Sequence, residues 1–383
     1  MLNRVIDESE SSEDWFDVAA ASAPDTPLLV VSEIRILNNV QRAAWHARHM
    51  GKMLCPHVKT HKMLEVARMQ LAAGATGLQV AKLSEADVML ESGVRDLLLA
   101  YPVVGKTKWD RVRDLSGQVD LRISLDSVEV ATGISESLSL DSEVGILLEV
   151  DTGLHRVGVA AGDVGELALA VGRLPGLRVI GVMTHEGHIG RRAQKDPRLT
   201  VELTAAAVNE MRIARDVLGD VGVVDPMISM GSTSTFEHLL TYHDVDEVRP
   251  GLYVFFDMNS VTAGAGRLDD VAAVVVSTVV SRSPQRGEFV IDAGSKSLSS
   301  DRRDLPNGSI TFGFVPSVGG QVVRLSEEHG VVSGAHRIPN VGERVVVVPN
   351  HICPVINLFD DAVLVDEDGV SGSWSIAARG RVR

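Results

Sequence analysis

One short stretch of the sequence gathers side chains that can do chemistry. The segment CPHVKTHK, residues 55–62, places Lys59 and Lys62 beside His57 and His61. Such a tract can be a solvated basic patch, a metal-binding tract, or a device that holds one reactive amine. Solvation is the commonest state of a lysine, since this residue is almost never fully buried without a partner. The local sequence does not decide among the three.

A second pair of chemically active residues lies in VVVVPNHICPVINL, near the end of the chain. If the backbone is extended there, residues two apart point the same way, so the His351 imidazole and the Cys353 thiol can meet one ion. Two ligands are too few to define a metal site. A buried cysteine beside a hydrogen-bonded histidine explains the local sequence more simply.

Length, charge and cysteine content exclude several classes of protein. A chain of 383 residues is long enough for a large domain and a smaller one. Its net charge of −14 repels phosphate backbones and anionic lipid, so we expect no nucleic acid or membrane partner. No apolar run reaches the roughly 18–20 residues of a membrane span, and the acidic start lacks the features of a secretory signal. With two cysteines and no disulfide framework, we expect a cytoplasmic protein.

The elements that must position these residues alternate between short apolar runs and longer segments of helical period. Eight runs after residue 52 read as strands, and they are 53–58, 77–81, 96–101, 120–126, 144–151, 177–185, 226–231 and 247–256. Helical segments lie between them, including 63–74, 84–93 with Ser84 as N-cap, and 198–219. The count favours a (β/α)8 TIM-type barrel over an open doubly wound sheet.

The pattern changes near residue 265, where short β-branched runs follow one another without long helices. We therefore expect a flexible acidic N-terminus at 1–23, a barrel domain at 24–264 and a mainly antiparallel β domain at 265–383. The early strand 26–32 is spare in the barrel count and is available to pair with the β domain. No internal repeat or low-complexity tract is evident.

A (β/α)8 barrel builds its site at the carboxyl ends of its strands, often with a phosphate site after strands seven and eight. Lys59 follows the first strand, Arg156 in DTGLHRVG follows the fifth, and His185 in MTHEGH follows the sixth. The turn GSTST, residues 231–235, follows the seventh and offers backbone N–H groups and hydroxyls to an oxyanion. A lysine, an arginine and a phosphate cradle at one mouth indicate pyridoxal 5′-phosphate (PLP) held as a Schiff base.

The sequence resembles the fold-type III PLP enzymes with an alanine racemase-like barrel, and among them the D-threonine aldolases and D-serine dehydratases. The motifs that carry the resemblance run in order over nearly the whole chain, and they are DTPLLVV, PHVKTHK, GLQVAKLSEADVM, DTGLHRVG, MTHEGH, GSTST, RPGLYVFFD, IDAGSKSLSSD, LSEEHG and PNHICPVINLFD. Agreement over so many ordered motifs is more specific than any one of them.

The resemblance implies a role for each candidate residue in the barrel. Lys59 is the Schiff-base lysine, Arg156 lies near the ring hydroxyl or imine side of the cofactor, and His185 lies near the substrate hydroxyl. The positions that match the phosphate-binding residues are Gly231, Ser232, Thr233, Gly251 and Tyr253. The alternatives that stay open are a solvated loop charge for Arg156 and a structural, hydrogen-bonded histidine of the mouth for His185.

The resemblance also changes the interpretation of His351 and Cys353. D-serine dehydratases of this family carry a His-x-Cys zinc pair near the C-terminus, whereas the D-threonine aldolases typically carry His-x-Asp and use other divalent ions. Thiolate and imidazole together select zinc over magnesium or calcium, which prefer oxygen ligands. We therefore expect His351 and Cys353 to bind Zn²⁺, with Mn²⁺ or another divalent cation as the alternative.

These residues predict a lyase that acts on a small D-3-hydroxy amino acid. The leading hypothesis is dehydration of D-serine, D-threonine or D-threo-3-hydroxyaspartate to a 2-oxo acid and ammonia, with Lys59 taking the α-proton. The alternative is aldol cleavage to glycine and an aldehyde with His185 as base, and a non-catalytic PLP-binding protein is a lesser one. A racemase needs a second acid/base, usually a tyrosine of the β domain, and no tyrosine lies beyond residue 265. Dimers are common in the family, so we expect a homodimer.

Overall fold

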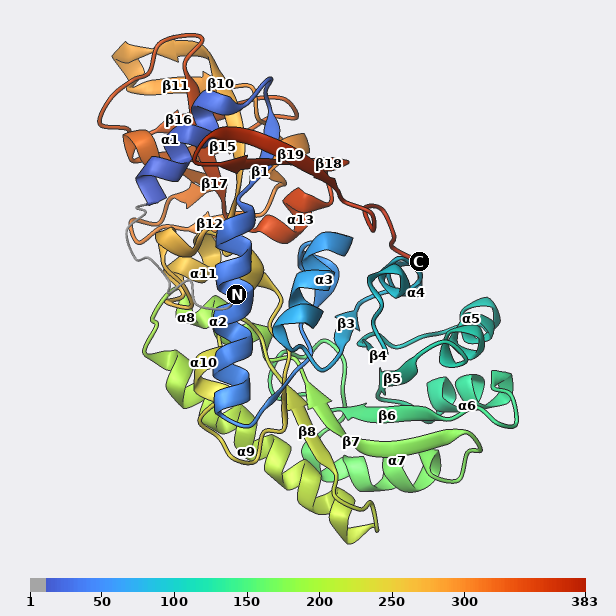
Figure 1. The fold of residues 1–383 in the computed structure, drawn as a ribbon. Helices are drawn as coiled ribbons and strands as arrows, with labels where there is room; N and C mark the ends of the chain where they lie inside the picture. Colours follow the sequence, from blue (N-terminus) through green and yellow to red (C-terminus); the bar gives the residue numbers. More distant parts are fainter. Residues whose placement is uncertain (1–11) are drawn as a thin grey trace. The chain divides into compact units, whose positions relative to one another are not determined.

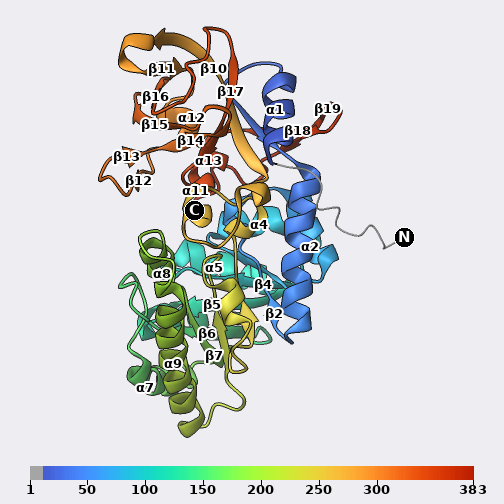
Figure 2. The same cartoon turned by 90° about the vertical axis from the view of Figure 1, so that its left-hand side faces the viewer.

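The computed structural model describes residues 12–383, with side chains from Trp15 onward, and divides them into two compact units. The barrel unit comprises residues 42–59, 64–251 and 380–383. The β unit comprises the described residues up to Gln41, together with 60–63 and 252–379. Figure 1 colours the chain along the sequence, and Figure 2 turns it by 90°. No helix in residues 12–383 is long and apolar enough to cross a bilayer.

The barrel unit contains a parallel sheet of eight strands in the order β2-β9-β8-β7-β6-β5-β4-β3. The strands are β2 (Met53–Leu54), β3 (Leu78–Val80), β4 (Asp96–Leu99), β5 (Asp120–Leu125), β6 (Val144–Glu149), β7 (Leu177–Thr184), β8 (Met227–Met230) and β9 (Glu247–Val248). A parallel bridge between His57 and Gln79 joins the two ends of this order. Each strand lies within one of the eight predicted runs, and the predicted (β/α)8 barrel is confirmed.

Helices follow the strands and lie outside the sheet in the views of Figures 1 and 2. They are α3 (Leu64–Ala73), α4 (Leu83–Met89), α5 (Lys106–Ser116), α6 (Val128–Ser137), α7 (Val164–Val171), α8 (Gly187–Ala193), α9 (Leu199–Asp220) and α10 (Phe236–Leu239). Ser84 was expected to cap α4 and does not, because the N-cap is Lys82, two residues earlier. The Ser84 hydroxyl instead accepts from the Arg383 backbone N–H at 3.0 Å.

A buried polar network fills part of the barrel interior. Arg122 of β5 lies 2.6 Å from Asp96 of β4 and 2.8 Å from the fully buried Glu247 of β9, the latter as an ion pair without hydrogen-bond geometry. Glu247 also accepts from the Ser229 hydroxyl of β8 at 2.5 Å. The Cys55 thiol lies 3.6 Å from Arg122, and burial together with Glu247 raises the pKa of this thiol. Cys55 is therefore a protonated core residue.

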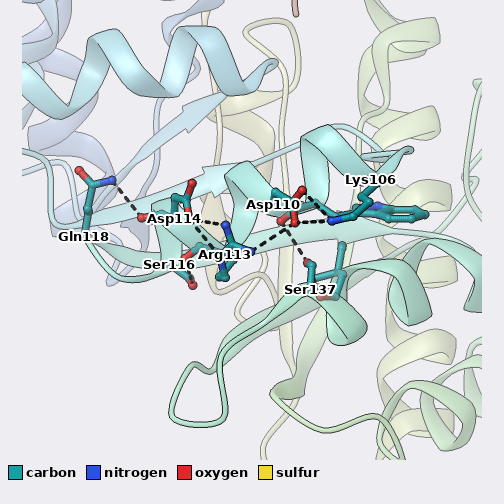
Figure 3. Close-up of polar contacts among 9 residues, drawn as sticks. Lys106, Asp110, Arg113, Asp114, Ser116, Gln118 and Ser137 are labelled. Carbon is teal, nitrogen blue, oxygen red and sulfur yellow. Dashed lines mark hydrogen bonds and ion pairs between the residues drawn. The ribbon is translucent and has the colours of Figure 1, made fainter.

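The charges on α5 form a surface network (Figure 3). Lys106 pairs with Asp110 at 2.9 Å, and Arg113 pairs with Asp110 at 3.3 Å and with Asp114 at 2.9 Å. A hydrogen bond joins α5 to its neighbour α6, because the Ser137 hydroxyl of α6 donates to a backbone carbonyl of α5 at 3.1 Å. Exposed pairs of this kind add little to stability. These contacts therefore connect side chains on the surface of α5 and join α5 to α6.

The β unit is built on a nine-stranded sheet in the order β11-β16-β15-β14-β17-β10-β1-β18-β19, with a further pairing of β10 and β11 that closes six strands into a barrel. The strands are β1 (Leu28–Val31), β10 (Ala273–Ser283), β11 (Glu288–Ile291), β14 (Gly313–Val315), β15 (Gly320–Leu325), β16 (Gly330–Ser333), β17 (Arg344–Pro349), β18 (Asp361–Asp366) and β19 (Gly369–Ser375). A separate hairpin joins β12 (Arg303–Asp304) to β13 (Ile310–Thr311). Apart from the parallel β1–β18 pair, its neighbouring strands run antiparallel.

The early strand β1 belongs to this sheet, where it pairs with β10 and with β18. The helix before it, α1 (Ser12–Ser22), falls in the segment expected to be flexible, whose first eleven residues lie outside the described part of the chain. Trp15 and Phe16 of α1 are 5% and 3% exposed, and the Arg35 guanidinium lies over the Trp15 ring at 5.2 Å. The acidic composition hid this amphipathic helix. The remaining helices are α2 (Glu33–His49), α11 (Met258–Thr262), α12 (Ser295–Leu298) and α13 (Ile352–Ile356).

Candidate active site

Lys59 lies at the carboxyl end of the first barrel strand, on a short 3-10 turn, η1 (Val58–Thr60). The chain still pairs with the barrel just before this turn, because the His57 N–H donates to the Pro250 carbonyl at 3.0 Å. On the other side, His57 Nδ1 lies 3.0 Å from the Gln79 carbonyl oxygen. His57 is thus held by hydrogen bonds on both sides, and these fix the backbone that carries the half-buried Lys59 side chain.

The rest of the tract is not a solvated basic patch. His57 is 7% exposed and His61 is fully buried, and His61 Nδ1 accepts from the Met63 N–H at 3.1 Å. Lys62 is 9% exposed, and its Nζ donates to the Ala378 carbonyl at 3.3 Å. A metal tract has no support either, since residues 12–383 hold no group of three or more His, Cys, Asp or Glu residues suited to an ion. Of the three interpretations, placement of one amine agrees best with these contacts.

His185, which follows β7, is surrounded by positive charge within the barrel unit. Burial of its ring, together with Lys59, Arg156 and Arg249, lowers the pKa of His185 well below 6.5, against a hydrogen bond to the Gly231 backbone. A histidine with such a pKa is neutral at pH 7 and can accept a proton. The same cations make this end of the barrel attractive to a phosphate group. Sequence analysis predicted Lys59, Arg156 and His185 here but not the third cation.

His57 makes the protein's stability depend on pH. Burial first, then the charges of Lys59, His185 and Arg249, lower the pKa of His57 well below 6.5, while its bond to the Gln79 carbonyl opposes this. Below pH 6.5 the imidazole binds a proton in the unfolded chain but not in the folded one, so the free energy of unfolding decreases as the pH is lowered. Between pH 7.5 and pH 5.5, the free energy of unfolding measured with urea should fall by about 1.4 kcal/mol more for the unchanged protein than for its His57→Asn variant. Equal losses would show that the imidazole is charged when folded.

Arg249 is the site residue that sequence analysis missed, although it lies in the quoted motif RPGLY. It is 3% exposed, its Nε donates to the Ser229 hydroxyl at 3.1 Å, and one Nη donates to the Thr184 carbonyl. Its other terminal nitrogen, Nη1, is buried and has no hydrogen-bond partner among the described residues. An arginine near the start of the predicted strand 247–256, just before the motif's Pro250, was the available signal. Such an orphaned cationic donor at the barrel mouth fits an anionic cofactor.

The predicted phosphate turn is held by a buried carboxylate. Glu186 accepts from the Thr235 hydroxyl and, at 3.3 Å, from the Gly231 N–H. Burial raises the pKa of Glu186 despite these hydrogen bonds. Gly231 has φ +144°, and an added Cβ would lie 2.7 Å from the Arg249 backbone nitrogen, so only glycine fits there. Ser232 closes the turn, with its Oγ 3.0 Å from the Thr235 Oγ1.

The other predicted cofactor residues have different surroundings. Arg156 is exposed in the loop after β6, yet its charge reaches Glu149 and His185. Thr233 is half-buried in the turn before α10, and Gly251 is half-buried at the boundary of the barrel unit. Tyr253 is 3% exposed in η4 (Leu252–Val254), which belongs to the β unit. Of the predicted cofactor residues, Tyr253 alone belongs to the β unit, and the others belong to the barrel unit.

In the β unit, His351 and Cys353 are brought together by a helix start and not by an extended strand. His351 is the N-cap of α13, and Cys353 lies in its first turn, where Pro354 suits helical φ. The Ile352 N–H at this helix start donates to the fully buried Asp257 carboxylate at 3.1 Å. The condition of an extended backbone is therefore not met at Cys353, because α13 begins at Ile352 and the Asp257 carboxylate holds its first N–H. The two side chains still meet, since His351 and Cys353 share a hydrogen bond.

A carboxylate orients the His351 ring. Asp301 Oδ2 lies 2.6 Å from His351 Nδ1. Burial opposes a proton on His351, but the charge of Cys353 and the hydrogen bond to Asp301 raise the pKa of this imidazole to about 11. A histidine that donates one ring N–H to a carboxylate and keeps the other nitrogen for an ion is the usual arrangement in metal sites. Sequence analysis missed Asp301, which lies fifty residues away from His351.

These donors fit a thiophilic divalent ion held by two protein ligands. Imidazole and thiolate suit zinc, and the Asp301 contact leaves Nε2 of His351 as the ligand atom. A zinc ion usually has three or four protein ligands. Residues 12–383 supply no third His, Cys, Asp or Glu ligand to such a group, so further positions would belong to water or substrate. A site of this kind is open to a substrate hydroxyl.

Asp301→Asn should weaken zinc binding by about 10- to 100-fold, because an amide holds the His351 ring without strengthening its ligand nitrogen. Competition with a chromophoric chelator measures this affinity. Asp304→Asn is the matched control, since Asp304 is an exposed carboxylate of the same hairpin and should keep full affinity. Equal zinc affinity in the two variants would show that Asp301 does not support the ion.

Comparison with known proteins agrees with this geometry. The model "Alanine racemase, N-terminal domain" matches residues 31–259, and "Putative serine dehydratase domain" matches residues 272–365. D-threo-3-hydroxyaspartate dehydratase of Delftia sp. (strain HT23) is 32% identical over 374 residues, 91% of this chain and 96% of that protein. D-threonine aldolase of Arthrobacter sp is 31% identical over 371 residues, 93% of each.

Solved structures give the same result. D-threonine aldolase from Filomicrobium marinum superposes with a TM-score of 0.84 at 28% identity, covering 94% of this chain and 97% of that one. A D-threo-3-hydroxyaspartate dehydratase with a cysteine replaced by alanine, in a metal-free form, gives 0.80 at 29% identity, with 93% and 98% covered. This chain belongs to the alanine racemase-like fold-type III family of PLP enzymes, with relatives among the D-threonine aldolases, D-serine dehydratases and hydroxyaspartate dehydratases.

Proposed function

We propose that this chain is a PLP- and zinc-dependent dehydratase of D-3-hydroxy amino acids. Its substrates are D-serine, D-threonine or D-threo-3-hydroxyaspartate, and its products are the corresponding 2-oxo acid and ammonia. The family supplies the reaction class, in which relatives of nearly equal identity carry out dehydration and aldol cleavage. The chain's own residues supply the choice between these two reactions.

One contact carries this proposal. In the β unit, the Cys353 Sγ donates to the Thr60 hydroxyl at 3.4 Å. Thr60 is joined by a peptide bond to Lys59, so one side-chain contact and one bond connect the thiol of the metal pair to the backbone of the reactive lysine. A base for the α-proton and an ion for the 3-hydroxyl are the two things that β-elimination of water requires. The Lys59 amine would be the base, and the His351–Cys353 pair would hold the ion.

Each residue then has a defined task. PLP, when bound, supplies the electron sink that makes the bonds to Cα labile. Lys59 would attach it and remove the α-proton, while Arg249 Nη1 and Arg156 would hold its charged groups. His351 and Cys353 would hold zinc, which supplies a Lewis acid for the 3-hydroxyl. Loss of the α-proton and of the hydroxyl releases one water and leaves an enamine, and hydrolysis of that enamine consumes one water and gives the 2-oxo acid and ammonia.

Aldol cleavage is the second candidate, and the state of His185 favours it. The lowered pKa of His185 keeps the ring neutral, so it can take the hydroxyl proton that cleavage of the Cα–Cβ bond requires. The products would then be glycine and an aldehyde. The relatives do not separate the two reactions.

Product analysis tests the proposal. The protein loaded with PLP and zinc is incubated with D-serine, D-threonine and D-threo-3-hydroxyaspartate, and the products are identified by NMR with and without a chelator. We expect a 2-oxo acid and ammonia, lost on chelation and restored by zinc. Glycine and an aldehyde would assign the aldolase instead, and no turnover of any D-amino acid despite bound cofactor would make it a non-catalytic PLP-binding protein.

A further inference from the structure

A run of positive charge without acidic partners lies on and just after the short helix α8. The segment 187–195, GHIGRRAQK, contains Arg191, Arg192 and Lys195 and no acidic residue. All three side chains are exposed, and no ion pair joins any of them to an acid among the described side chains. On α5, by contrast, the charged side chains pair with one another (Figure 3). The charge on α8 is therefore not neutralised within the fold.

The effect of this charge is seen at His188, which lies on α8 three residues before Arg191. Burial first, then the charge of Arg192, lowers the pKa of His188, and His155 and Arg191 act in the same direction, against Asp151. The buried Nδ1 of His188 has no hydrogen-bond partner among the described residues. Three cations act here against one carboxylate, so the potential at this part of the barrel mouth is positive.

Two close contacts place α8 beside the predicted phosphate turn, within the barrel unit. A Cβ added at Gly190 would lie 2.6 Å from the Ser234 Oγ, so the helix backbone packs against the GSTST turn. A Cβ added at Gly153 would lie 3.2 Å from His188 Nε2, so the helix also packs against the loop after β6. The two arginines of α8 directly follow Gly190 in the sequence. Their charge is thus attached to the rim of the predicted phosphate site.

We propose that Arg191, Arg192 and Lys195 form a steering surface that attracts the phosphate group of PLP from solution to the barrel mouth. The net charge of −14 repels a phosphate dianion at long range, and a local positive surface offsets this repulsion and raises the rate of encounter. Charges at an exposed rim mainly change association and its salt dependence. This inference rests on the proposed function for the cofactor site, and it holds for dehydration and for aldol cleavage alike.

Phosphate is the group that such a surface selects. A phosphate monoester carries about two negative charges at pH 7. D-Serine and D-threonine have one positive and one negative group, so a field of this kind does not attract them. The GSTST turn offers hydroxyl and N–H groups but no lysine or arginine of its own, so the attraction at a distance has to come from neighbouring cations. Inorganic phosphate shares this chemistry, and the absorbance of PLP distinguishes the cofactor from it.

Stopped-flow absorbance tests the inference through the second-order rate constant for PLP binding to the apoprotein. At about 0.1 M salt, where the Debye length is about 10 Å, Arg191→Gln combined with Arg192→Gln should slow association about 3- to 10-fold. The dissociation rate should not change. At about 1 M salt, where the Debye length is about 3 Å, the difference should disappear. Pyridoxal, which lacks the phosphate, should associate equally fast with both proteins.

Arg95→Gln combined with Arg173→Gln is the matched control. These two arginines are also exposed and lack an acidic partner among the described side chains, but they precede β4 and β7. They lie at the amino ends of these strands, and several residues of about 3.3 Å each separate them from the mouth, which exceeds the Debye length. The control should therefore keep its association rate. A double lysine variant at the two arginines of α8 keeps the charge and should keep the rate as well.

The salt dependence of the unchanged protein is a second measurement that needs no variant. Its PLP association should slow as salt is added, whereas pyridoxal association should not; a PLP rate that rises with salt would overturn the inference. Equal association rates in the glutamine variant and the unchanged protein, or a lysine variant as slow as the glutamine variant, would also overturn it. Faster dissociation at an unchanged association rate would make the arginines ligands of bound phosphate, which contradicts steering. If the unchanged protein binds no PLP, the proposed function itself has failed.

Discussion

Lys59→Arg should abolish turnover, with a loss on the order of 10²–10⁴-fold or more in kcat. Arginine keeps the positive charge that acts on His57 and His185, so the electrostatic surroundings of the site are retained. It is never deprotonated at ordinary pH, however, and so can neither attack a carbonyl nor accept the α-proton. Kinetics with D-3-hydroxy amino acids measures the loss, and the absorbance of bound cofactor reports attachment.

Lys62→Arg is the matched control for this variant. Lys62 lies in the same tract and is buried to a greater extent, with its Nζ on the Ala378 carbonyl of the β unit. It should keep both cofactor attachment and turnover within a few-fold of the unchanged protein. If turnover survives in Lys59→Arg and disappears in Lys62→Arg, the reactive amine is Lys62, and the assignment to Lys59 is wrong.

Arg122→Met should destabilise the protein by about 3–5 kcal/mol, because it leaves a buried carboxylate without its partner. Glu247 is fully buried between β2 and β8 in the sheet, and Arg122 is its ion-pair partner at 2.8 Å. The thiol of Cys55 loses its polar neighbour in the same variant. Urea unfolding measures the change, and the unfolding transition should move to a clearly lower denaturant concentration.

Arg113→Met is the control for the removal of one arginine. The Arg113 pairs lie on the exposed face of α5, so its loss should change stability very little (Figure 3). A double variant, Arg122→Met with Glu247→Leu, should recover much of the lost stability, since two apolar residues need no counterion. If Arg122→Met is as stable as Arg113→Met, the buried network does not hold the barrel together.

The barrel was predictable because its strands have a periodicity that sequence displays. β6 is buried along its whole length, and VGILLE is apolar without alternation up to Glu149, as expected of a parallel strand covered on both faces. β5 is buried after Asp120 but alternates, because Arg122 and Ser124 bind the buried carboxylates Glu247 and Glu149. The shortest strands, Met53–Leu54 and Glu247–Val248, were predicted too long, because the pairing continues through isolated backbone bonds beyond them. Strand existence was readable and strand length was not.

Each departure from the sequence-based expectation has a physical cause. The helix at Ser12–Ser22 was overlooked because its acidic composition masks a small apolar face formed by Trp15 and Phe16. Ser84 has the composition of an N-cap, but its hydroxyl receives the Arg383 N–H, a partner almost three hundred residues away. For His351 and Cys353 an extended backbone was considered as one condition for a shared ion, yet a helix starts there on Asp257. Partners distant in the sequence decided the second and third of these, and no local pattern reports them.

The site divides in the same way. Motif order located Lys59, His185 and the His351–Cys353 pair, since each follows or caps a recognisable element. The residues that set their chemistry, Arg249 and Asp301, act through contacts that only folding creates. Sequence therefore predicted the groups that would react, and the structure added the groups that would tune them.

Reductive trapping tests the role of Lys59 most directly. Protein loaded with PLP is treated with borohydride, digested, and mapped by peptide mass spectrometry. The prediction is a single pyridoxyl label on Lys59, in the peptide that contains CPHVKTHK, and no label in the Lys59→Arg protein. A label on Lys62 or on any other lysine, or bound cofactor with no covalent label at all, would contradict the account.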